Sequence, residues 1–328
     1  MEISILGSGS WSTAIAYLLS AKYDVLMYAR NPEDTEFINN NHKNRKYLKD
    51  FDLPKNIKAT SDIQQLFKNR FIVNGIPTQS TRSVIREFKG YFNKENVYVN
   101  LSKGLELESH NRISEIFYQE LGKDNSYAIL SGPSHAEEVI KKMPTAIVCA
   151  SNDLKLAKEI QEIFNSDWFR VYTSEDLVGV ELGGAIKNTL AFGIGILDGL
   201  GYGDNTKAAV ITRGINEMNR LLEKFNADPK TLNGLAGVGD LIVTATSINS
   251  RNYRTGLLIG QGKNMQDAIN EVNMVVEGIP TTKALNQLAN QYNLDLPITK
   301  EIYKILYENK DPNDSVASLM GRTLKSEF

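Results

Sequence analysis

The sequence predicts an α/β fold in two parts, an N-terminal Rossmann-like, mainly parallel sheet domain at residues 1–175 and an all-helical C-terminal domain at residues 176–328. Three observations predict this. Short apolar strands alternate with helical patterns up to about Thr173, which is typical of a parallel sheet. A glycine-rich turn joins the first strand to the first helix. Beyond Thr173 the strand patterns largely vanish, and the chain is longer than one hydrophobic core usually grows.

The chain opens with a strand, a turn, a helix and a second strand, at residues 3–6, 7–12, 14–19 and 24–28. This order suits a dinucleotide. Gly7 permits a tight turn, Gly9 lets a pyrophosphate approach the backbone, and the helix N-terminus carries a partial positive charge toward it. Ser12 stands where the fingerprint usually has its third glycine, which serves close packing of helix and strand. The fingerprint is therefore weaker than a complete one.

The end of the second strand bears on the choice of nicotinamide cofactor. Residues 29–31 contain no Asp or Glu, although a strict NAD enzyme would place one there to bind the ribose. Arg30 would instead pair with the 2′-phosphate of NADP by charge-assisted hydrogen bonds. The alternative is a solvated arginine in a turn before Pro32. The sequence thus favours NADP(H) and leaves NAD(H) open.

The alternation of strands and helices continues along the chain. Further strands are predicted at residues 71–75, 97–101, 127–130, 145–150 and 169–172, with helices at 80–88, 113–121 and 155–164. The turns at residues 76–79, 102–104 and 131–135 would lie at the carboxyl ends of strands, where open α/β sheets bind their ligands. Helices are then predicted at residues 181–197, 206–224, 252–261, 265–270, 280–292 and 297–307. A cleft between the two domains is the expected substrate site.

Composition limits the partners and the compartment. Lys and Arg number 37 against 39 Asp and Glu, so a net charge of −2 gives no reason to expect nucleic acid or an anionic membrane. The single cysteine, Cys149, excludes an intramolecular disulfide and indicates a reducing, cytoplasmic compartment. We expect no secretory leader, because the N-terminus lacks a basic n-region and a long apolar h-region. We expect no membrane span, because no apolar run approaches ~20 residues. His42 has no second His or Cys at metal spacing, so no metal is predicted.

Lys187 is unusual because it lies in an apolar segment of small residues. Residues 183–185 are Gly, Gly and Ala, and Leu190 to Ile194 follow, so a helix here would be buried on most of its circumference. A buried lysine costs free energy unless it is paired or takes part in chemistry. The ordinary alternative is a lysine at a helix edge whose ammonium group reaches water.

Several motifs together resemble one family, the bacterial-type NAD(P)-dependent glycerol-3-phosphate dehydrogenases. The matching segments are Gly7 to Trp11, Ser102 to Glu106, Gly132 to Val139, Glu181 to Lys207, Gly234 to Leu241, Ser250 to Asn252 and Val276 to Gly278. They occur in the family's order and extend over nearly the whole chain. Three residues depart from the family pattern: Ser12 replaces a glycine, His135 a common Phe, and Tyr253 lies in a usually more basic run. These departures bear on cofactor preference and affinity more than on the reaction.

The resemblance implies a reversible hydride transfer that interconverts dihydroxyacetone phosphate and sn-glycerol 3-phosphate. The glycerol 3-phosphate would be used in phospholipid synthesis. Lys187 matches the catalytic lysine, a general acid in reduction and a general base in oxidation. Asp240 matches the carboxylate that orients this lysine and contacts the substrate hydroxyls; the alternative is a helix N-cap. Asn188 and Thr244 would complete the catalytic group as neutral hydrogen-bonding side chains, unless they are satisfied locally.

The resemblance also implies binding residues. Ser250, Arg251 and Asn252 match the phosphate-binding residues at a helix start, although such a triplet is also an ordinary capped helix start. The remaining substrate contacts are Lys103, Gly132 and Ser134, beside Lys187 and Asp240. The cofactor contacts are Gly7, Gly9, Ser10, Trp11, Arg30, Tyr47, Lys103, Ala136, Arg251, Val275 and Glu277. Glu277 is expected to face the ribose or the amide of the cofactor, and the family suggests a homodimer.

Two other classes of function compete with this interpretation. One is a hydroxyacid dehydrogenase on the same two-domain plan, which would oxidise a phosphate-free hydroxy acid. The other is a catalytically silent NADP-binding sensor in which Lys187 is structural. The presence of Lys187, Asp240 and Arg251 together argues against silence, because the proton carrier, its orienting acid and the phosphate ligand are all present.

Overall fold

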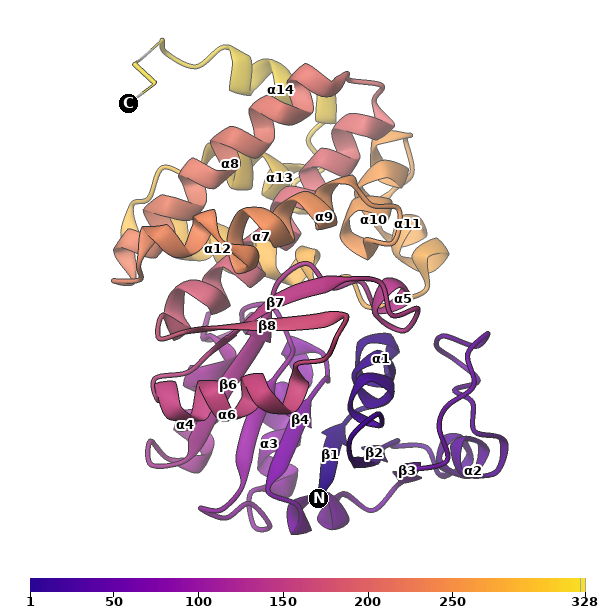
Figure 1. Cartoon of the computed structure of the whole chain (residues 1–328). Helices are drawn as coiled ribbons and strands as arrows, with labels where there is room; N and C mark the ends of the chain where they lie inside the picture. Colours follow the sequence, from indigo (N-terminus) through magenta and orange to yellow (C-terminus); the bar gives the residue numbers. More distant parts are fainter. Residues whose placement is uncertain (325, 328) are drawn as a thin grey trace.

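The computed structural model describes residues 1–324 and 326–327. Figure 1 shows a layered molecule, with the N-terminus in a sheet layer and the last helix, residues 312–320, at the far end of a helical layer. One eight-stranded sheet has the order β3-β2-β1-β4-β5-β6-β7-β8. The strands are β1 Glu2–Leu6, β2 Asp24–Tyr28, β3 Ile57–Thr60, β4 Phe71–Asn74, β5 Val97–Asn100, β6 Ser126–Ser131, β7 Thr145–Ala150 and β8 Phe169–Ser174. The strand order reverses direction between β1 and β4, and the glycine-rich turn follows β1 at this point.

The sheet is parallel except where β7 pairs antiparallel with β6. The chain between β6 and β7 contains only the short helix α5 (Ala136–Val139), whereas a parallel return needs a full crossover. Helix α6 (Leu154–Phe164) supplies such a crossover between β7 and β8, which are parallel to each other. All residues of β4 and β5 are buried, as expected for strands covered on both faces.

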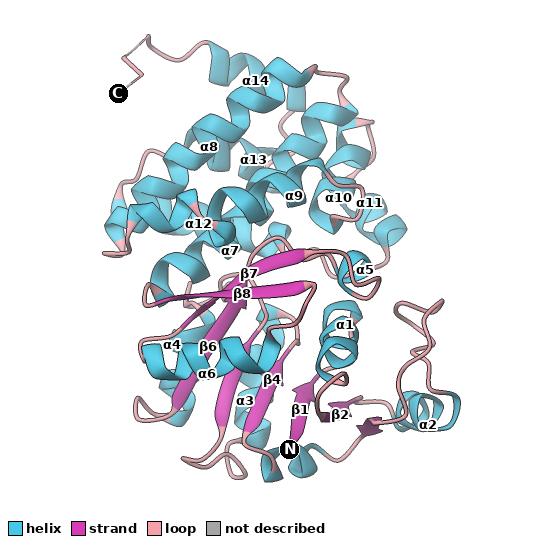
Figure 2. Cartoon of the chain, in the orientation of Figure 1, coloured by secondary structure: helices cyan, strands magenta, loops and turns pink. Residues whose placement is uncertain are grey.

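Helices cover the sheet and form the second layer (Figure 2). Beside α5 and α6, the sheet layer carries α1 Ser10–Leu19, α2 Pro32–Asn41, α3 Thr81–Phe88 and α4 Ile113–Leu121, with 3-10 turns η1 Ile63–Lys68 and η2 Thr78–Ser80. The helical layer contains α7 Leu177–Gly199, α8 Asp204–Lys224, α9 Asp240–Thr246, α10 Arg251–Gly260, α11 Met265–Val272, α12 Gly278–Tyr292, α13 Pro297–Tyr307 and α14 Pro312–Met320. The short segments η3 Pro229–Asn233 and η4 Leu235–Gly239 precede α9.

This architecture confirms the predicted fold class, a mainly parallel Rossmann-like sheet followed by helices. Strand β3 and helices α2, α5, α9 and α14 were not predicted from the sequence. Helix α2 is polar and mostly exposed, and it begins where the Asn31 side chain accepts a hydrogen bond from the Glu33 backbone amide with Pro32 at its first turn. Helix α9 has seven residues, and α14 has nine with one buried. Such helices lack the long apolar period on which the prediction rests.

Helix α7 joins the two layers. Its first turns, through Leu177 and Val180, belong to the apolar cluster on one face of the sheet, whereas Leu182, Leu190 and Ile194 belong to the core of the helical layer. Among the described residues, α7 is the one helix long and apolar enough to cross a membrane, but its apolar window is entirely buried inside the protein. It is therefore the central core helix of this fold.

Candidate functional site

Lys187 lies in the middle of α7 and is only 6% exposed. Its Nζ donates to Asp240 Oδ1 at 2.5 Å and to Thr244 Oγ1 at 2.7 Å. Asp240 begins α9 and Thr244 follows one turn later, so both side chains lie on the face of α9 that meets α7. The lysine therefore has a buried acid and a hydroxyl as partners rather than water, which excludes the alternative of a lysine at a helix edge.

Asp240 is shared by two lysines. Its Oδ2 accepts from Lys103 Nζ at 2.6 Å, and Lys103 also donates to the carbonyl oxygen of Gly132 at 3.0 Å. Lys103 follows β5 and Gly132 follows β6, so two strand ends of the sheet layer meet α9 of the helical layer here. The alternative that Asp240 caps a helix is wrong, because its side chain makes no capping hydrogen bond and Gly239 occupies the N-cap position of α9.

The buried charges shift the ionisation of both partners. Burial lowers the pKa of Lys187 to about 8, with further lowering by Lys103 and Arg251 and opposition from Asp240. Burial raises the pKa of Asp240, but Lys103 and Lys187 outweigh burial and hold that pKa below its ordinary value. The site thus contains an ionised acid and a lysine that can exchange a proton near neutral pH.

Two amide side chains hold three helices of the site together. Asn188 Nδ2 donates to the carbonyl oxygen of Lys103 at 3.3 Å, and Asn188 Oδ1 accepts from Asn252 Nδ2 at 2.9 Å. Asn252 Oδ1 in turn accepts from the backbone amide of Gly278 at 2.8 Å. These bonds connect α7, α10 and α12, so both amides fix the position of Lys187 relative to the start of α10.

The start of α10 carries one free cation. Ser250 caps the helix, because its side chain accepts from the backbone amide of Tyr253 at 3.3 Å. The Arg251 side chain is exposed and makes no hydrogen bond or ion pair within the described residues. Its charge still lowers the pKa of Lys187. The guanidinium is therefore available to an anion close to the buried lysine.

The loop after β6 requires glycine at Gly132. Its φ is +139°, and a Cβ there would lie 3.0 Å from the Cα of Ile147. Ser134 Oγ donates to the Gly132 carbonyl oxygen at 2.8 Å, and Ala136 begins α5. The loop thus presents the same carbonyl oxygen to Ser134 and Lys103.

The turn after β1 leaves open space beside its backbone at Gly7 and Gly9, and this space is called the cradle below. Gly7 adopts a φ of +118°, and no atom lies within 4 Å of the Cβ position on Gly9, the N-cap of α1. Ser12 is fully buried, and a Cβ on Gly75 would approach Ser12 Oγ to 2.1 Å. Gly75 thus provides the space that a third glycine at position 12 would have provided.

A second loop is tied to this turn. Asn44, for which no role was predicted, donates through Nδ2 to the carbonyl oxygen of Ser8 and to Thr13 Oγ1, each at 2.9 Å. Its Oδ1 accepts from the backbone amide of Tyr47 at 3.1 Å. Tyr47 therefore lies on a loop held beside the cradle, whereas Arg30 is exposed after β2. An Asn in a polar loop gives no signal for this role in the sequence.

Glu277, at the N-cap of α12, has a buried carboxyl group that contacts the sheet layer after β4. Its Oε1 accepts from the backbone amide of Thr78 at 2.9 Å, and the Thr78 hydroxyl is a second hydrogen-bond donor to this carboxyl group. Val275 nearby is half exposed. The open cradle and the buried carboxyl group fit a nicotinamide dinucleotide, whose phosphates and amide would bind them.

Two family models match this chain. One, described as the NAD-dependent glycerol-3-phosphate dehydrogenase N-terminus, matches residues 2–157, and its C-terminal counterpart matches residues 176–317. The chain belongs to the NAD-dependent glycerol-3-phosphate dehydrogenase family. This confirms the predicted family and makes the chain an NAD(P)-dependent oxidoreductase of that class.

Relatives of this dehydrogenase family match over the full length. The NAD(P)+ glycerol-3-phosphate dehydrogenase of Staphylococcus haemolyticus is 47% identical over 331 residues, covering 99% of both chains. That of Macrococcus caseolyticus is 45% identical and covers 100% of both. The crystal structure of a glycerol-3-phosphate dehydrogenase from Coxiella burnetii has a TM-score of 0.94 at 36% identity, covering 98% and 99%. A ketopantoate reductase from Ralstonia eutropha, at 14% identity and a TM-score of 0.61, shares the fold alone.

Two residues that depart from the glycerol-3-phosphate dehydrogenase pattern have local partners. The ring Nε2 of His135 lies 3.2 Å from the carbonyl oxygen of Val243 in α9. The Tyr253 hydroxyl donates to Asp198, whose other oxygen accepts from Lys207 at 2.7 Å. His135 thus joins the loop after β6 to α9, and Tyr253 joins α10 to the end of α7.

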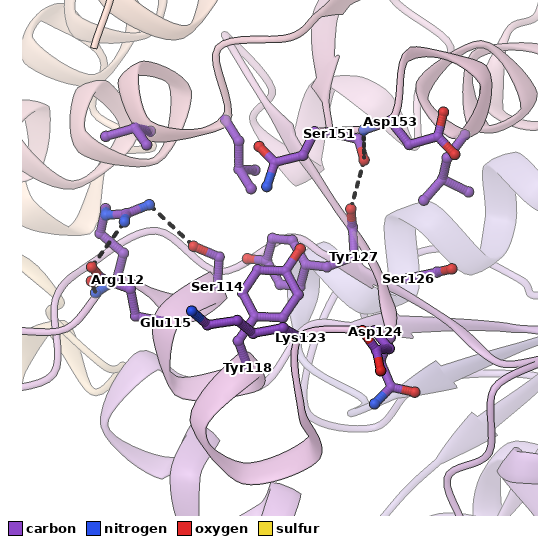
Figure 3. A pocket seen from close by; sticks show the side chains of 15 residues that line it. Arg112, Ser114, Glu115, Tyr118, Lys123, Asp124, Ser126, Tyr127, Ser151 and Asp153 are labelled. Atoms are coloured by element: carbon purple, nitrogen blue, oxygen red, sulfur yellow. Dashed lines mark hydrogen bonds and ion pairs between the residues drawn. The ribbon is translucent and has the colours of Figure 1, made fainter. Parts of the chain in front are cut away.

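A separate pocket of about 500 Å³ lies between α4, β6, α6 and the start of α7 (Figure 3). None of the predicted site residues lines it. Three of its lining residues, Arg112, Ser114 and Tyr127, donate hydrogen bonds to the carboxylate of Glu181 in α7. The pocket is therefore part of the junction between the layers and lies apart from the lysine cluster.

Proposed function

We propose that this dehydrogenase interconverts dihydroxyacetone phosphate and sn-glycerol 3-phosphate, with Lys187 as the general acid and base. The observation that carries the proposal is the buried Lys187 Nζ, which Asp240 and Thr244 hold at 2.5 and 2.7 Å beside a free arginine. Its pKa of about 8 lets it both give and take a proton near neutral pH.

Each catalytic side chain has a distinct role in this proposal. When bound, the nicotinamide supplies or accepts the hydride at carbon 2 of the substrate. Lys187 protonates the developing alkoxide during reduction and removes the hydroxyl proton during oxidation. Asp240 accepts a hydrogen bond from the Lys187 ammonium group, raises the pKa of that lysine and contacts the substrate hydroxyls. Thr244 accepts a second hydrogen bond, which fixes the orientation of the same ammonium group. Asn188 donates to substrate oxygen once its long bond to Lys103 yields.

The substrate phosphate binds at the start of α10. Arg251 contributes its guanidinium, while Ser250 and Asn252 contribute a helix N-terminus and a fixed amide. Three residues of the sheet layer complete the substrate site: Lys103, Gly132 and Ser134. Supporting this arrangement, Lys103 already lies against both Asp240 and Gly132.

The cofactor binds along the turn after β1 and reaches across to α12. The residues that would hold it are Gly7, Gly9, Ser10, Trp11, Arg30, Tyr47, Lys103, Ala136, Arg251, Val275 and Glu277. Arg30 is exposed where the 2′-phosphate of NADP would lie, which favours NADP(H) while NAD(H) remains open. The product, glycerol 3-phosphate, would supply phospholipid synthesis in the cytoplasm. The enzyme would act as a homodimer. Each subunit would consist of a dinucleotide-binding domain at residues 1–175 and a helical substrate domain at residues 176–328.

A spectrophotometric assay of NADPH and NADH oxidation tests this function directly. We expect oxidation that depends on dihydroxyacetone phosphate, and reverse reduction of the cofactor with sn-glycerol 3-phosphate. Activity with a phosphate-free hydroxy acid in place of glycerol 3-phosphate would favour the hydroxyacid dehydrogenase. Cofactor binding without turnover of any of these substrates would favour the silent sensor.

A further inference from the structure

Two buried asparagines end neighbouring strands beside the lysine cluster. Asn74 is the last residue of β4 and Asn100 the last residue of β5, and the two residues pair across the sheet. Each is fully buried and follows a run of apolar and aromatic residues, at 71–73 and 97–99. An amide in a protein interior costs free energy unless its hydrogen bonds are made. Apolar packing therefore does not account for these two side chains.

Asn100 holds the turn that carries Lys103. Its Oδ1 accepts from the backbone amide of Ser102 at 3.0 Å, and its Nδ2 donates to the carbonyl oxygen of the same residue at 2.9 Å. The Ser102 carbonyl belongs to the planar peptide group that joins Ser102 to Lys103, so the second bond fixes the orientation of that plane. Asn100 thus sets the direction in which the chain enters Lys103.

Asn74 ties this turn to the turn after β4. Its Nδ2 donates to Asn100 Oδ1 at 2.9 Å and lies 3.4 Å from Ser102 Oγ. Its Oδ1 lies 3.4 Å from the backbone amide of Ile76, whose carbonyl oxygen accepts from the Ser102 hydroxyl. Turning the Asn100 amide over would place its NH₂ against two other donors, so the network allows one orientation. The two turns are therefore held together as one unit.

The Lys103 side chain leaves this turn along a narrow path. A Cβ on Gly184 of α7 would lie 3.4 Å from Lys103 Cγ, so the lysine passes close over the helix at a glycine. Its Nζ then reaches Asp240 Oδ2 at 2.6 Å and the carbonyl oxygen of Gly132 at 3.0 Å. A change of direction at the Lys103 backbone would press the side chain against α7 or withdraw its Nζ from Asp240.

We propose that Asn74 and Asn100 are positioning residues that hold the ammonium group of Lys103 against Asp240. Asn100 acts on the backbone beside Lys103, and Asn74 acts through Asn100. This inference rests on the proposed function, in which Lys103 and Asp240 contact the substrate and Asp240 orients Lys187. The alternative is that the two amides only satisfy the strand ends, which would stabilise the fold without affecting the lysines.

The position of Lys103 affects the proton affinity of Lys187. Lys103 and Arg251 lower the pKa of Lys187, and Asp240 raises it. If Lys103 leaves its place at Asp240, the pKa of Lys187 should therefore rise from its value of about 8. The falling limb of kcat against pH in reduction should then move to higher pH, because the lysine stays protonated longer. A loss of stability alone would not move this limb.

Kinetics of the full chain with Asn100→Ala, Lys103→Met and the double variant test the proposal. Asn100→Ala should move the falling limb to higher pH and lower kcat by about 10- to 100-fold, since a misplacement of about 1 Å can cost about 10²-fold. In the Lys103→Met background the same change should lower kcat by less than about twofold, because no lysine is left to position. NMR of isotope-labelled lysine side chains measures the Lys187 pKa without substrate, and this pKa should rise in both single variants.

The matched control is Asn96→Ala, just before β5 at the opposite end of that strand. Asn96 is also a buried amide, and its Nδ2 donates to the carbonyl oxygens of Phe67 and Asn69 at 3.2 and 2.8 Å. This variant should lower the melting temperature and leave both the pH profile and the Lys187 pKa where they are. Its effect on stability therefore calibrates what the loss of one buried amide does without any contact to the Lys103 turn.

Asn74→Ala keeps both bonds between Asn100 and Ser102, so it should shift the profile in the same direction by a smaller amount. It carries the test if Asn100→Ala folds poorly. Additive effects of the Asn100 and Lys103 changes on kcat, or an unmoved Lys187 pKa in both asparagine variants, would overturn the proposal. If the wild type oxidised neither NADPH nor NADH with dihydroxyacetone phosphate, the proposed function would fail, whereas NMR would still test the placement of Lys103.

Discussion

At the residue scale, Lys187 combines two opposing influences. Burial and the nearby cations Lys103 and Arg251 weaken its hold on the proton, and Asp240 strengthens it. Reduction needs the protonated lysine and oxidation needs the neutral one. Because the pKa is about 8, the forward rate should fall and the reverse rate should rise as pH increases through that value.

Measured kcat against pH in both directions checks this expectation. Asp240→Asn removes the carboxylate that raises the pKa of Lys187, so the falling limb of the reduction profile should move to lower pH.

Lys187→Ala should lower turnover by about 10² to 10⁴ while the cofactor still binds. Turnover of dihydroxyacetone phosphate at the wild-type rate by this variant would contradict the role of Lys187.

Arg251 offers a second test at this scale. Its side chain is exposed and unpaired within the described residues, so Arg251→Ala should leave folding intact and raise KM for dihydroxyacetone phosphate by about 10- to 100-fold, the worth of a charge-assisted contact. Dihydroxyacetone, which lacks the phosphate, should be affected little. Arg86→Ala, at an exposed ion pair in the sheet layer, is the control. An unchanged KM for the phosphorylated substrate would count against the assignment.

Ser12 and Gly75 pack against each other in the protein interior, where there is room for a side chain on one of them only. Gly75→Ala places a methyl group where Ser12 Oγ lies, at 2.1 Å, and should cost about 1–3 kcal/mol of stability. Ser12→Gly in the same chain should restore the melting temperature and the cofactor affinity. Thermal unfolding of the two single variants and the double variant measures the coupling. Additive effects in the double variant would show that the two sites do not compensate each other.

At the scale of elements, α7 and α10 cross at close range through glycine. A Cβ on Gly256 would lie 2.1 Å from the carbonyl oxygen of Phe192, and one on Gly195 equally close to that of Tyr253. The crossing sets the distance between Lys187 on α7 and the phosphate site at the start of α10. Backbone atoms cannot yield as a flexible side chain can, so the helices must separate if either glycine gains a methyl group.

Gly256→Ala should therefore lower both stability and activity. We expect a loss of about 1–3 kcal/mol from overpacking, and a lower kcat/KM because Lys187 and Arg251 move apart. Gly90→Ala is the control, since no atom lies within 4 Å of its Cβ position. Chemical denaturation and steady-state kinetics measure the two effects. A Gly256→Ala variant with wild-type kcat/KM would show that this crossing does not set the site geometry.

The elements also show what a sequence can reveal. All strands except β3, and α7, were predictable because their apolar patterns are local. Lys187 was singled out by its apolar surroundings, whereas Asp240 and Lys103 were found through family motifs. The reversed direction of β7 depends on how the chain returns from β6, which no local pattern records. Asn44 and Thr78 were missed for a related reason: their partners lie up to 199 residues away, and each sits in an ordinary polar turn.

At the scale of the whole molecule, α7 makes the two layers depend on each other. Its first turns complete the apolar cluster on the sheet, and its later turns form the centre of the helical core. Buried polar bonds cross the same junction, from Arg112 to Glu181 and from Lys103 to Asp240. Loss of the helical core should therefore destabilise the sheet, so the proposed domains should unfold together.

The distribution of tryptophan allows a direct test of this coupling. Trp11 and Trp168, the only tryptophans of the chain, pack against the sheet core, whereas helices dominate the far-UV circular dichroism. Leu190→Ala opens a cavity in the helical core, whereas both tryptophans pack against the separate sheet core, and should cost about 2–5 kcal/mol. If the layers unfold together, fluorescence and circular dichroism should shift to the same lower melting temperature. The exposed Met320→Ala should shift neither, and an unmoved fluorescence transition in Leu190→Ala would show that the sheet layer unfolds on its own.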